Sequence, residues 1–182
     1  MGSANSALFS VVHSVILMRL PYRNPEELVI IWQRFPNMPD PPGARLHASR
    51  RNYLAWKRDS RAFAGMAALR QLILPETGSP TRATVSVAAA GFDLFPMLGV
   101  TARAGRLFRT EEEERGRDLV AVLSDAFFAK RFGRDPATIG RTIGLGGASY
   151  TIIGVLPPEF HLPSTHAGED QWRPEVWVPL SR

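Results

Sequence analysis

The 182-residue chain contains no cysteine, and this absence removes several kinds of chemistry at once. Disulfides, thiolate zinc sites, iron–sulfur clusters and cysteine nucleophiles all need a sulfur that this chain does not supply. The sequence also has no G-x-S-x-G motif, which marks the nucleophile of many serine hydrolases. These absences leave the cellular compartment open, but they remove the commonest routes to a catalytic or redox site.

The chain also has few long blocks of like-charged residues and few long hydrophobic stretches. The chain is 45% hydrophobic and 21% charged with a mean hydropathy of −0.10, which excludes a disordered chain and a polytopic membrane protein. The net charge is +5, but its basic residues are scattered among acidic ones, so we expect no nucleic-acid partner. With 15 glycines and 15 prolines, the chain is rich in turns, and we predict an α+β fold.

Four groups of residues could carry chemistry, and each has a simpler explanation. Gly144–Gly147 precedes a strand rather than a helix, so it predicts a hairpin turn and no phosphate-binding loop. The acidic run Glu111–Glu114 predicts a solvated face or a helix start.

The third group consists of two histidines and two carboxylates, which could bind a metal ion together: His161, His166, Glu169 and Asp170. Their spacing fits no helical face, so we predict that they are loop side chains. The fourth group has helical spacing and could line a ligand groove, although such residues more often form core: Tyr53, Trp56, Phe63 and Met66. We therefore predict no catalytic, cofactor-binding or metal-binding residues, and no enzyme.

The periodicity and turn residues predict short elements throughout. The expected helices begin at Ser49 and at Ser124 or Asp125, with further short ones around residues 63–69, 91–99 and 136–140. The expected strands are Leu28–Gln33, Gln71–Leu74, Thr81–Ala89, Leu119–Leu123, Ile143–Leu145, Ser149–Val155 and Glu175–Leu180.

The first apolar segment, Ser6–Met18, is unusual. As a helix it would span about 20 Å against a hydrocarbon core of about 30 Å, so it is too short to cross a membrane by itself. It lacks the basic start and cleavage site of a signal peptide. A buried core helix, an interfacial segment and the outer end of a transmembrane helix all remain open from the residues alone.

Several sequence segments, taken in order, resemble one known family. These segments are Leu54–Ala68 (LAWKRDSRAFAGMAA), Gly91–Val100 (GFDLFPMLGV), Gly105–Phe108 (GRLF), Ile139–Ile143 (IGRTI) and Trp177–Leu180 (WVPL). Through them the chain is similar to the MacB-like periplasmic core domains of ABC transporter permeases, and within them to the duplicated, acidobacterial-type permeases.

The resemblance implies a non-enzymatic domain on the periplasmic side of the cell inner membrane. It implies an α+β fold with a porter-like α/β lobe and a smaller β-rich lobe, preceded by the end of a transmembrane helix. Residues 1–22 would be the outer part of the first membrane helix and its exit, and residues 23–182 the core domain, incomplete at its C-terminal end. The implied partners are the membrane, the remaining permease helices, a separate ATPase and a periplasmic protein, with no cofactor. The alternative is a soluble binding module for an acidic partner or a small ligand.

Overall fold

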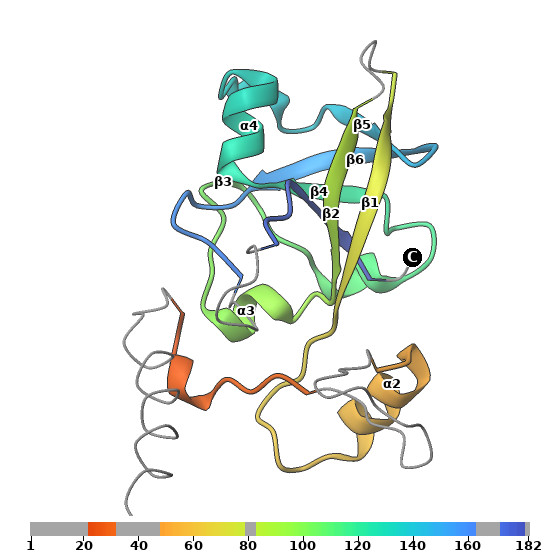
Figure 1. Ribbon diagram of the computed structural model, residues 1–182, viewed down its shortest axis with the longest axis vertical. Helices are drawn as coiled ribbons and strands as arrows, with labels where there is room; N and C mark the ends of the chain where they lie inside the picture. The colour runs from red at the N-terminus through yellow and green to blue at the C-terminus, as the bar shows by residue number, and fades with distance from the viewer. Residues whose placement is uncertain (1–21, 32–47, 79–82, 163–171, 181–182) are drawn as a thin grey trace, which may run out of the picture.

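A computed structural model describes residues 22–31, 48–78, 83–162 and 172–180, and its centre is one mixed sheet of seven strands (Figure 1). The order across the sheet is β3-β6-β4-β7-β2-β1-β5. Because β5 pairs with β6 as well as with β1, the ladder closes on itself. The strands are β1 (Leu69–Thr77), β2 (Thr84–Ala90), β3 (Ala104–Gly105), β4 (Val120–Leu123), β5 (Thr142–Leu145), β6 (Ala148–Val155) and β7 (Val176–Pro179).

The described α-helices are α2 (Arg50–Asp59), α3 (Leu94–Leu98) and α4 (Asp125–Phe132). Both longer helices begin at a serine cap, as predicted: Ser49 Oγ accepts a hydrogen bond from Asn52 N at 3.2 Å, and Ser124 Oγ accepts one from Phe127 N at 3.2 Å. Helix α4 ends at Gly133, whose φ of 59° is the left-handed conformation that glycine adopts without strain. Single turns of 3-10 helix cover Pro25–Glu27, Thr110–Glu113 and Pro136–Thr138.

The hairpin predicted at Gly144–Gly147 is confirmed. Strands β5 and β6 join at Gly146 and Gly147, whose φ values of 59° and 84° suit a type I′ turn. Strand β1 pairs antiparallel with β2 but runs past Pro75 to Thr77, further than predicted. Pro75 has no N–H to donate, but its carbonyl still accepts a hydrogen bond, from Gly146 N at 2.9 Å.

Strand β7 completes the sheet from the far end of the chain. It lies between β2 and β4, parallel to the first and antiparallel to the second. Strands β4 and β6 are parallel as well. The α+β fold class is confirmed.

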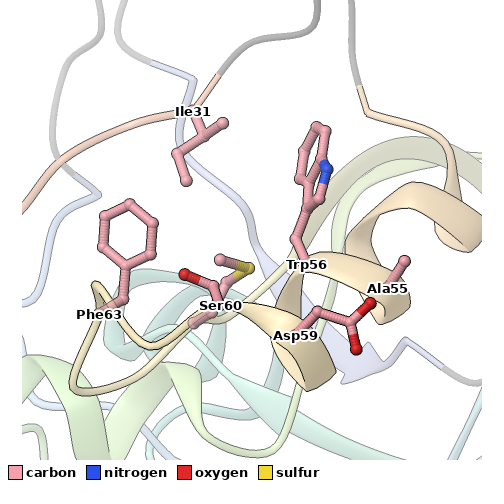
Figure 2. A pocket seen from close by; sticks show the side chains of 7 residues that line it. Ile31, Ala55, Trp56, Asp59, Ser60 and Phe63 are labelled. Carbon is pink, nitrogen blue, oxygen red and sulfur yellow. The ribbon is translucent and has the colours of Figure 1, made fainter.

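The predicted strand Leu28–Gln33 is wrong over the part that the structure describes. Residues 28–31 pair with no described strand, and Val29, Ile30 and Ile31 are 63%, 51% and 41% exposed. Ile31 instead projects toward Trp56 and Phe63 across an open hollow (Figure 2). A strand needs a neighbour for its backbone groups, and none of the described segments lies in pairing distance.

The predicted short helix over residues 63–69 is also wrong. Ser60 ends α2 in an extended conformation, and its hydroxyl accepts a hydrogen bond from Ala62 N at 3.3 Å. Such a local bond offers the backbone an alternative to continuing the helix, and Gly65 further disfavours one. The chain stays irregular until Leu69, where β1 begins.

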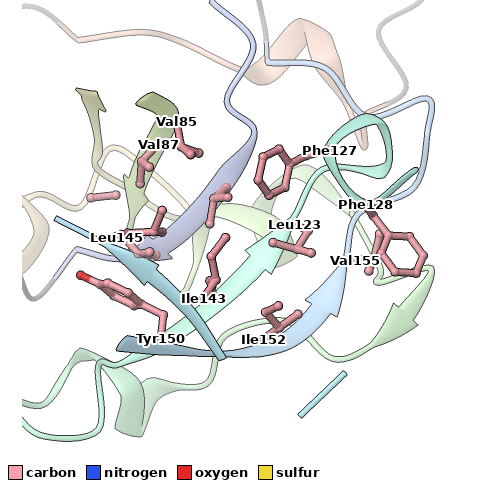
Figure 3. Close-up of a cluster of buried hydrophobic side chains, with 14 residues drawn as sticks. Val85, Val87, Leu123, Phe127, Phe128, Ile143, Leu145, Tyr150, Ile152 and Val155 are labelled. Atoms are coloured by element: carbon pink, nitrogen blue, oxygen red, sulfur yellow. The ribbon is translucent and has the colours of Figure 1, made fainter. Parts of the chain in front are cut away.

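Successive residues of the central strands are buried on both faces of the sheet. Val87 and Ala89 of β2 belong to one cluster, which the strands and α4 enclose (Figure 3), while Ala88 and Ala90 belong to a second cluster beneath α3. Strand β7 divides in the same way, since Val176 and Val178 face the first cluster and Trp177 the second. Burial on both faces explains why these strands are continuously apolar.

Some expectations concern residues outside the described ranges. These are the apolar segment Ser6–Met18 and the predicted C-terminal part of the strand beginning at Leu28. His166, Glu169 and Asp170 also lie there. Within the described residues, no helix has the length and apolar character needed to cross a bilayer.

Candidate functional site

The predicted loop histidines include one that the structure describes. His161 is exposed just after Phe160. Among residues 22–31, 48–78, 83–162 and 172–180, no three His, Asp or Glu side chains come together in a way that could hold a metal ion.

The acidic run differs from the prediction at one residue. Glu111–Glu114 was expected to form a solvated face or a helix start. A 3-10 turn does begin at Thr110, but Glu112 is only 7% exposed. Its carboxylate accepts two hydrogen bonds from Arg106, at 2.6 and 3.1 Å, and a third from Arg109 N at 2.9 Å. The hydrogen bonds to Glu112 raise the pKa of Arg106. Glu112 therefore fastens the loop after β3, and the sequence of four adjacent acids does not show which one is buried.

A second buried carboxylate, Asp125, was missed by sequence reasoning except as a possible helix cap. Asp125 is 6% exposed and is bracketed by two half-exposed guanidiniums, Arg103 and Arg134. The Arg134 Nη2–Asp125 Oδ2 distance is 2.7 Å. This triad ties the start of α4 to its C-terminal turn and to the loop before β3, so its role is structural.

The structure brings three of the four groove candidates together. Trp56, Phe63 and Met66 line an open hollow of about 550 Å³ with Ile31, Ala55, Asp59 and Ser60 (Figure 2). Phe63 is 42% exposed, so the expectation that this group is core is wrong for that residue. Tyr53 instead is buried, with its hydroxyl donating to Met66 O at 3.3 Å. The hollow is almost entirely apolar and presents no constellation for catalysis.

Helix α2 is joined to α3 by a polar contact beside this hollow. Lys57 Nζ lies 2.6 Å from Asp93 Oδ2 and 5.0 Å from the centre of the Phe92 ring. Burial opposes the charged form of Lys57, but hydrogen bonds to Asp93 and Tyr53 outweigh it and raise the pKa of the ammonium. Burial and the charge of Asp93 raise the pKa of Tyr53. The contact is thus an ion pair with aromatic walls between α2 and α3.

The N-terminal end of the described chain is anchored in an aromatic cluster. The Tyr22 ring lies 6.3 Å from that of Phe160, which is 5.6 Å from Trp177 and 5.8 Å from Phe95. The next residue continues the contact, because Arg23 N donates to Leu98 O at 3.1 Å. Burial raises the pKa of Tyr22 to about 12. Tyr22 therefore connects the chain that precedes it to α3 and β7.

Two solved structures share this architecture. One is the extracellular domain of the noncanonic ABC-type transporter YknZ from Gram-positive bacteria (TM-score 0.53, 16% identity, 70% of this chain and 60% of that one). The other is the periplasmic region of MacB from Actinobacillus actinomycetemcomitans (TM-score 0.50, 15% identity, 71% of this chain and 55% of that one). This chain therefore spans less than two thirds of either structure. No curated protein matches it significantly.

The fold is thus that of extracytoplasmic domains of ABC-type transporters. The chain belongs to the family of MacB-like periplasmic core domains, whose model matches residues 3–182. This membership confirms the resemblance seen in the sequence. The family is one of transporter permease domains that face the periplasm, and it is not a known class of enzyme.

Proposed function

We propose that this chain is an extracytoplasmic part of an ABC-type efflux permease in the cell inner membrane, and that it transmits the motion of membrane helices to a periplasmic substrate or partner. The family match over residues 3–182 carries this proposal. Residues 1–22 would be the outer end of the first membrane helix and its exit. Residues 23–182 would belong to the core domain.

The position of Tyr22 supports a mechanical role. Only three residues separate it from Met18, the last residue of the apolar segment, and the four steps from one α-carbon to the next reach about 14 Å at most in extended chain. A displacement of the membrane helix would therefore reach Tyr22 through a very short connection. Since Tyr22 is buried against Phe160, the displacement would pass to the aromatic cluster and so to α3 and β7.

The sheet is suited to receiving such a displacement as a rigid body. Its ladder closes on itself, and both of its faces are buried by side chains. Densely packed cores deform little and transmit strain rather than absorbing it. The buried carboxylates Glu112 and Asp125 fasten the loops beside β3 to the same body. We infer that the sheet moves as one unit.

The proposal is tested on the permease purified from membranes with its ATPase. We expect the ATPase to copurify, and we expect ATP with vanadate to change hydrogen exchange at the Arg23 amide, which is bonded to Leu98 O. Tyr22→Ala should abolish that change while Tyr22→Phe, which keeps the ring, preserves it. A permease without an ATPase partner, or a chain recovered from the soluble fraction with an acidic protein, would instead favour a binding module.

A further inference from the structure

Strand β1 lacks a described neighbour along one side for most of its length. Residues 69–75 pair with β2, but on the other side β1 meets β5 at Glu76 and Thr77 alone. None of the described strands pairs with that other side over residues 69–74. The ladder therefore closes at the end of β1, and residues 69–74 form what we call the open edge.

Backbone hydrogen bonds show which residues of β1 face the open edge. Glu76 N donates to Ala83 O at 2.8 Å, on the side of β2. The preceding residue is Pro75, whose carbonyl accepts a hydrogen bond from Gly146 N at 2.9 Å, on the side of β5. Residues of an antiparallel strand alternate in this way, so the odd-numbered residues of β1 turn their backbone groups toward the open edge.

Three residues therefore offer backbone donors and acceptors to a further strand: Leu69, Gln71 and Ile73. Their side chains are exposed as well, by 37% for Leu69 and 67% for Ile73, and Gln71 between them is also exposed. None of the three is a proline or a charged residue, which natural proteins use to block strand edges. An open edge of this kind is a template for pairing with a strand of another chain.

The order of the residues makes the open edge complementary to itself. When a second copy runs antiparallel with Gln71 opposite Gln71, Leu69 of each copy lies opposite Ile73 of the other. The three opposed pairs exchange two backbone hydrogen bonds each, so every outward-facing group of these residues is used. Leucine beside isoleucine is a favourable cross-strand pair. On the opposite face Arg70 lies across from Leu72, whose half-buried side chain the aliphatic part of the arginine can cover.

The neighbouring registers fit less well. A shift of two residues in one direction sets Leu69 opposite Pro75, which has no N–H and whose carbonyl already accepts from Gly146 N. A shift of two residues in the other direction sets Ile73 opposite residue 67, which lies before the start of β1. A shift of one residue would oppose outward-facing and inward-facing backbone groups. The pairing centred on Gln71 is thus the register that the open edge favours.

We propose that the open edge is an interface between two copies of this chain, which pair antiparallel about Gln71 and join their two sheets into one. The interface is symmetric, with the same residues contributed by both copies. Five residues a side are few beside the roughly 20–30 a side of a stable interface, so the pairing is weak in dilute solution and forms where two copies are held close together. The inference needs no ATPase and no membrane helix, so it does not depend on the proposed function.

Single cysteines test the register, since the 182-residue chain has none of its own. Gln71→Cys sets two thiols on α-carbons about 5.5 Å apart. Ile73→Cys sets them about 14 Å apart, because four residues along the strand separate the two positions. Each variant is made in the protein that carries residues 1–182, freed of cysteines elsewhere, and is treated in cells with a cross-linker that spans about 5 Å.

We expect Gln71→Cys to give a covalent dimer and Ile73→Cys to give none, although Ile73 is 67% exposed and its thiol is accessible. Leu69→Cys alone should also give none. Coexpression of Leu69→Cys with Ile73→Cys should restore the dimer, because these two positions lie opposite each other in the proposed register. Equal yields from Gln71→Cys and Ile73→Cys would overturn the proposal. Cross-linking of Gln71→Cys to a different protein, identified by the mass of the product, would assign the open edge to that partner instead.

A charge reversal separates pairing from damage to the fold. With Leu69→Cys and Ile73→Cys as reporters, Gln71→Lys in both copies places two like charges opposite each other and should lower the dimer yield about threefold or more. Gln71→Lys in one copy and Gln71→Glu in the other should restore the yield, which a merely misfolded lysine variant would not allow. An unchanged yield with lysine in both copies, or no recovery with the opposite charges, would contradict pairing about Gln71.

Discussion

Lys57 Nζ lies 2.6 Å from Asp93 Oδ2, and this ion pair holds helix α2 against the start of α3. Both side chains are partly buried, at 31% and 24% exposure, and the Phe92 ring covers the ammonium. We expect Lys57→Met to lower the free energy of unfolding by about 1 kcal/mol. Amide hydrogen exchange should accelerate in α2 and remain unchanged in β4 and β6, because the substitution weakens only the contact between α2 and α3.

The matched control for Lys57→Met is Arg58→Met. Arg58 pairs with its neighbour Asp59 on the surface, where both side chains are more than 60% exposed. Surface pairs of this kind contribute little to stability, so hydrogen exchange in α2 should stay as in the parent protein. Equal acceleration by both substitutions would mean that the Lys57–Asp93 contact does not hold the helix.

Asp125 should be among the most sensitive acidic residues of the chain. Asp125→Ala leaves Arg103 and Arg134 without their buried partner and removes a first-turn carboxylate from α4. We expect a loss of about 2–3 kcal/mol in urea unfolding. Glu114→Ala serves as the control, because Glu114 is 69% exposed and 3.8 Å from Arg117, and should change the unfolding free energy by less than about 0.5 kcal/mol.

Gly154 marks a close approach of two backbones. A β-carbon at this position would lie 2.1 Å from the carbonyl oxygen of Arg106, so the loop after β3 would have to move. We expect Gly154→Ala to cost about 3 kcal/mol or more in thermal or urea unfolding. Gly116→Ala has open space around it and only an unfavourable φ of 94°, so it should cost about 1 kcal/mol. Similar losses for the two variants would contradict the packing at β3.

Tyr22 predicts a change in stability at alkaline pH. Its pKa in the folded protein is about 12, above the ordinary value of 10.0. The contribution of the buried, neutral Tyr22 to the free energy of unfolding is therefore complete below pH 10 and is lost as the pH rises toward 12. Tyr22→Phe should flatten this part of the pH dependence, measured by urea unfolding at pH 9 and pH 11.5. At pH 7 the variant should be at least as stable as the parent, because the Tyr22 hydroxyl has no hydrogen-bond partner among the described residues. An unchanged alkaline loss in the variant would exclude Tyr22 as its source.

The features predicted correctly from the sequence are mainly those fixed by nearby residues. Ser49 and Ser124 begin helices because each serine caps an amide three residues away. Gly146 and Gly147 form a hairpin turn because their positive φ values need only the two glycines themselves. The family resemblance was accessible because it rests on ordered motifs rather than on tertiary contacts.

The features that the sequence did not reveal depend on distant partners. The closure of the sheet needs Thr77 of β1 to meet Gly144 of β5, and no local pattern encodes that contact. Burial of Glu112 depends on Arg106, and its neighbours Glu111 and Glu113 have the same chemistry. Val29–Ile31 has the residues of a strand but no strand to pair with among the described residues, so propensity alone gave the wrong answer.

The most direct test of an extracytoplasmic permease domain is protease accessibility in cells whose inner membrane is intact. Trypsin added from outside should cut the permease within this domain, for example at the exposed Arg115 and Arg117, while the cytoplasmic ATPase stays whole until detergent is added. Cleavage of the domain before detergent, with the ATPase protected, is the predicted result. A domain that is protected until the membrane is dissolved, or that fractionates with cytosolic proteins, would contradict it.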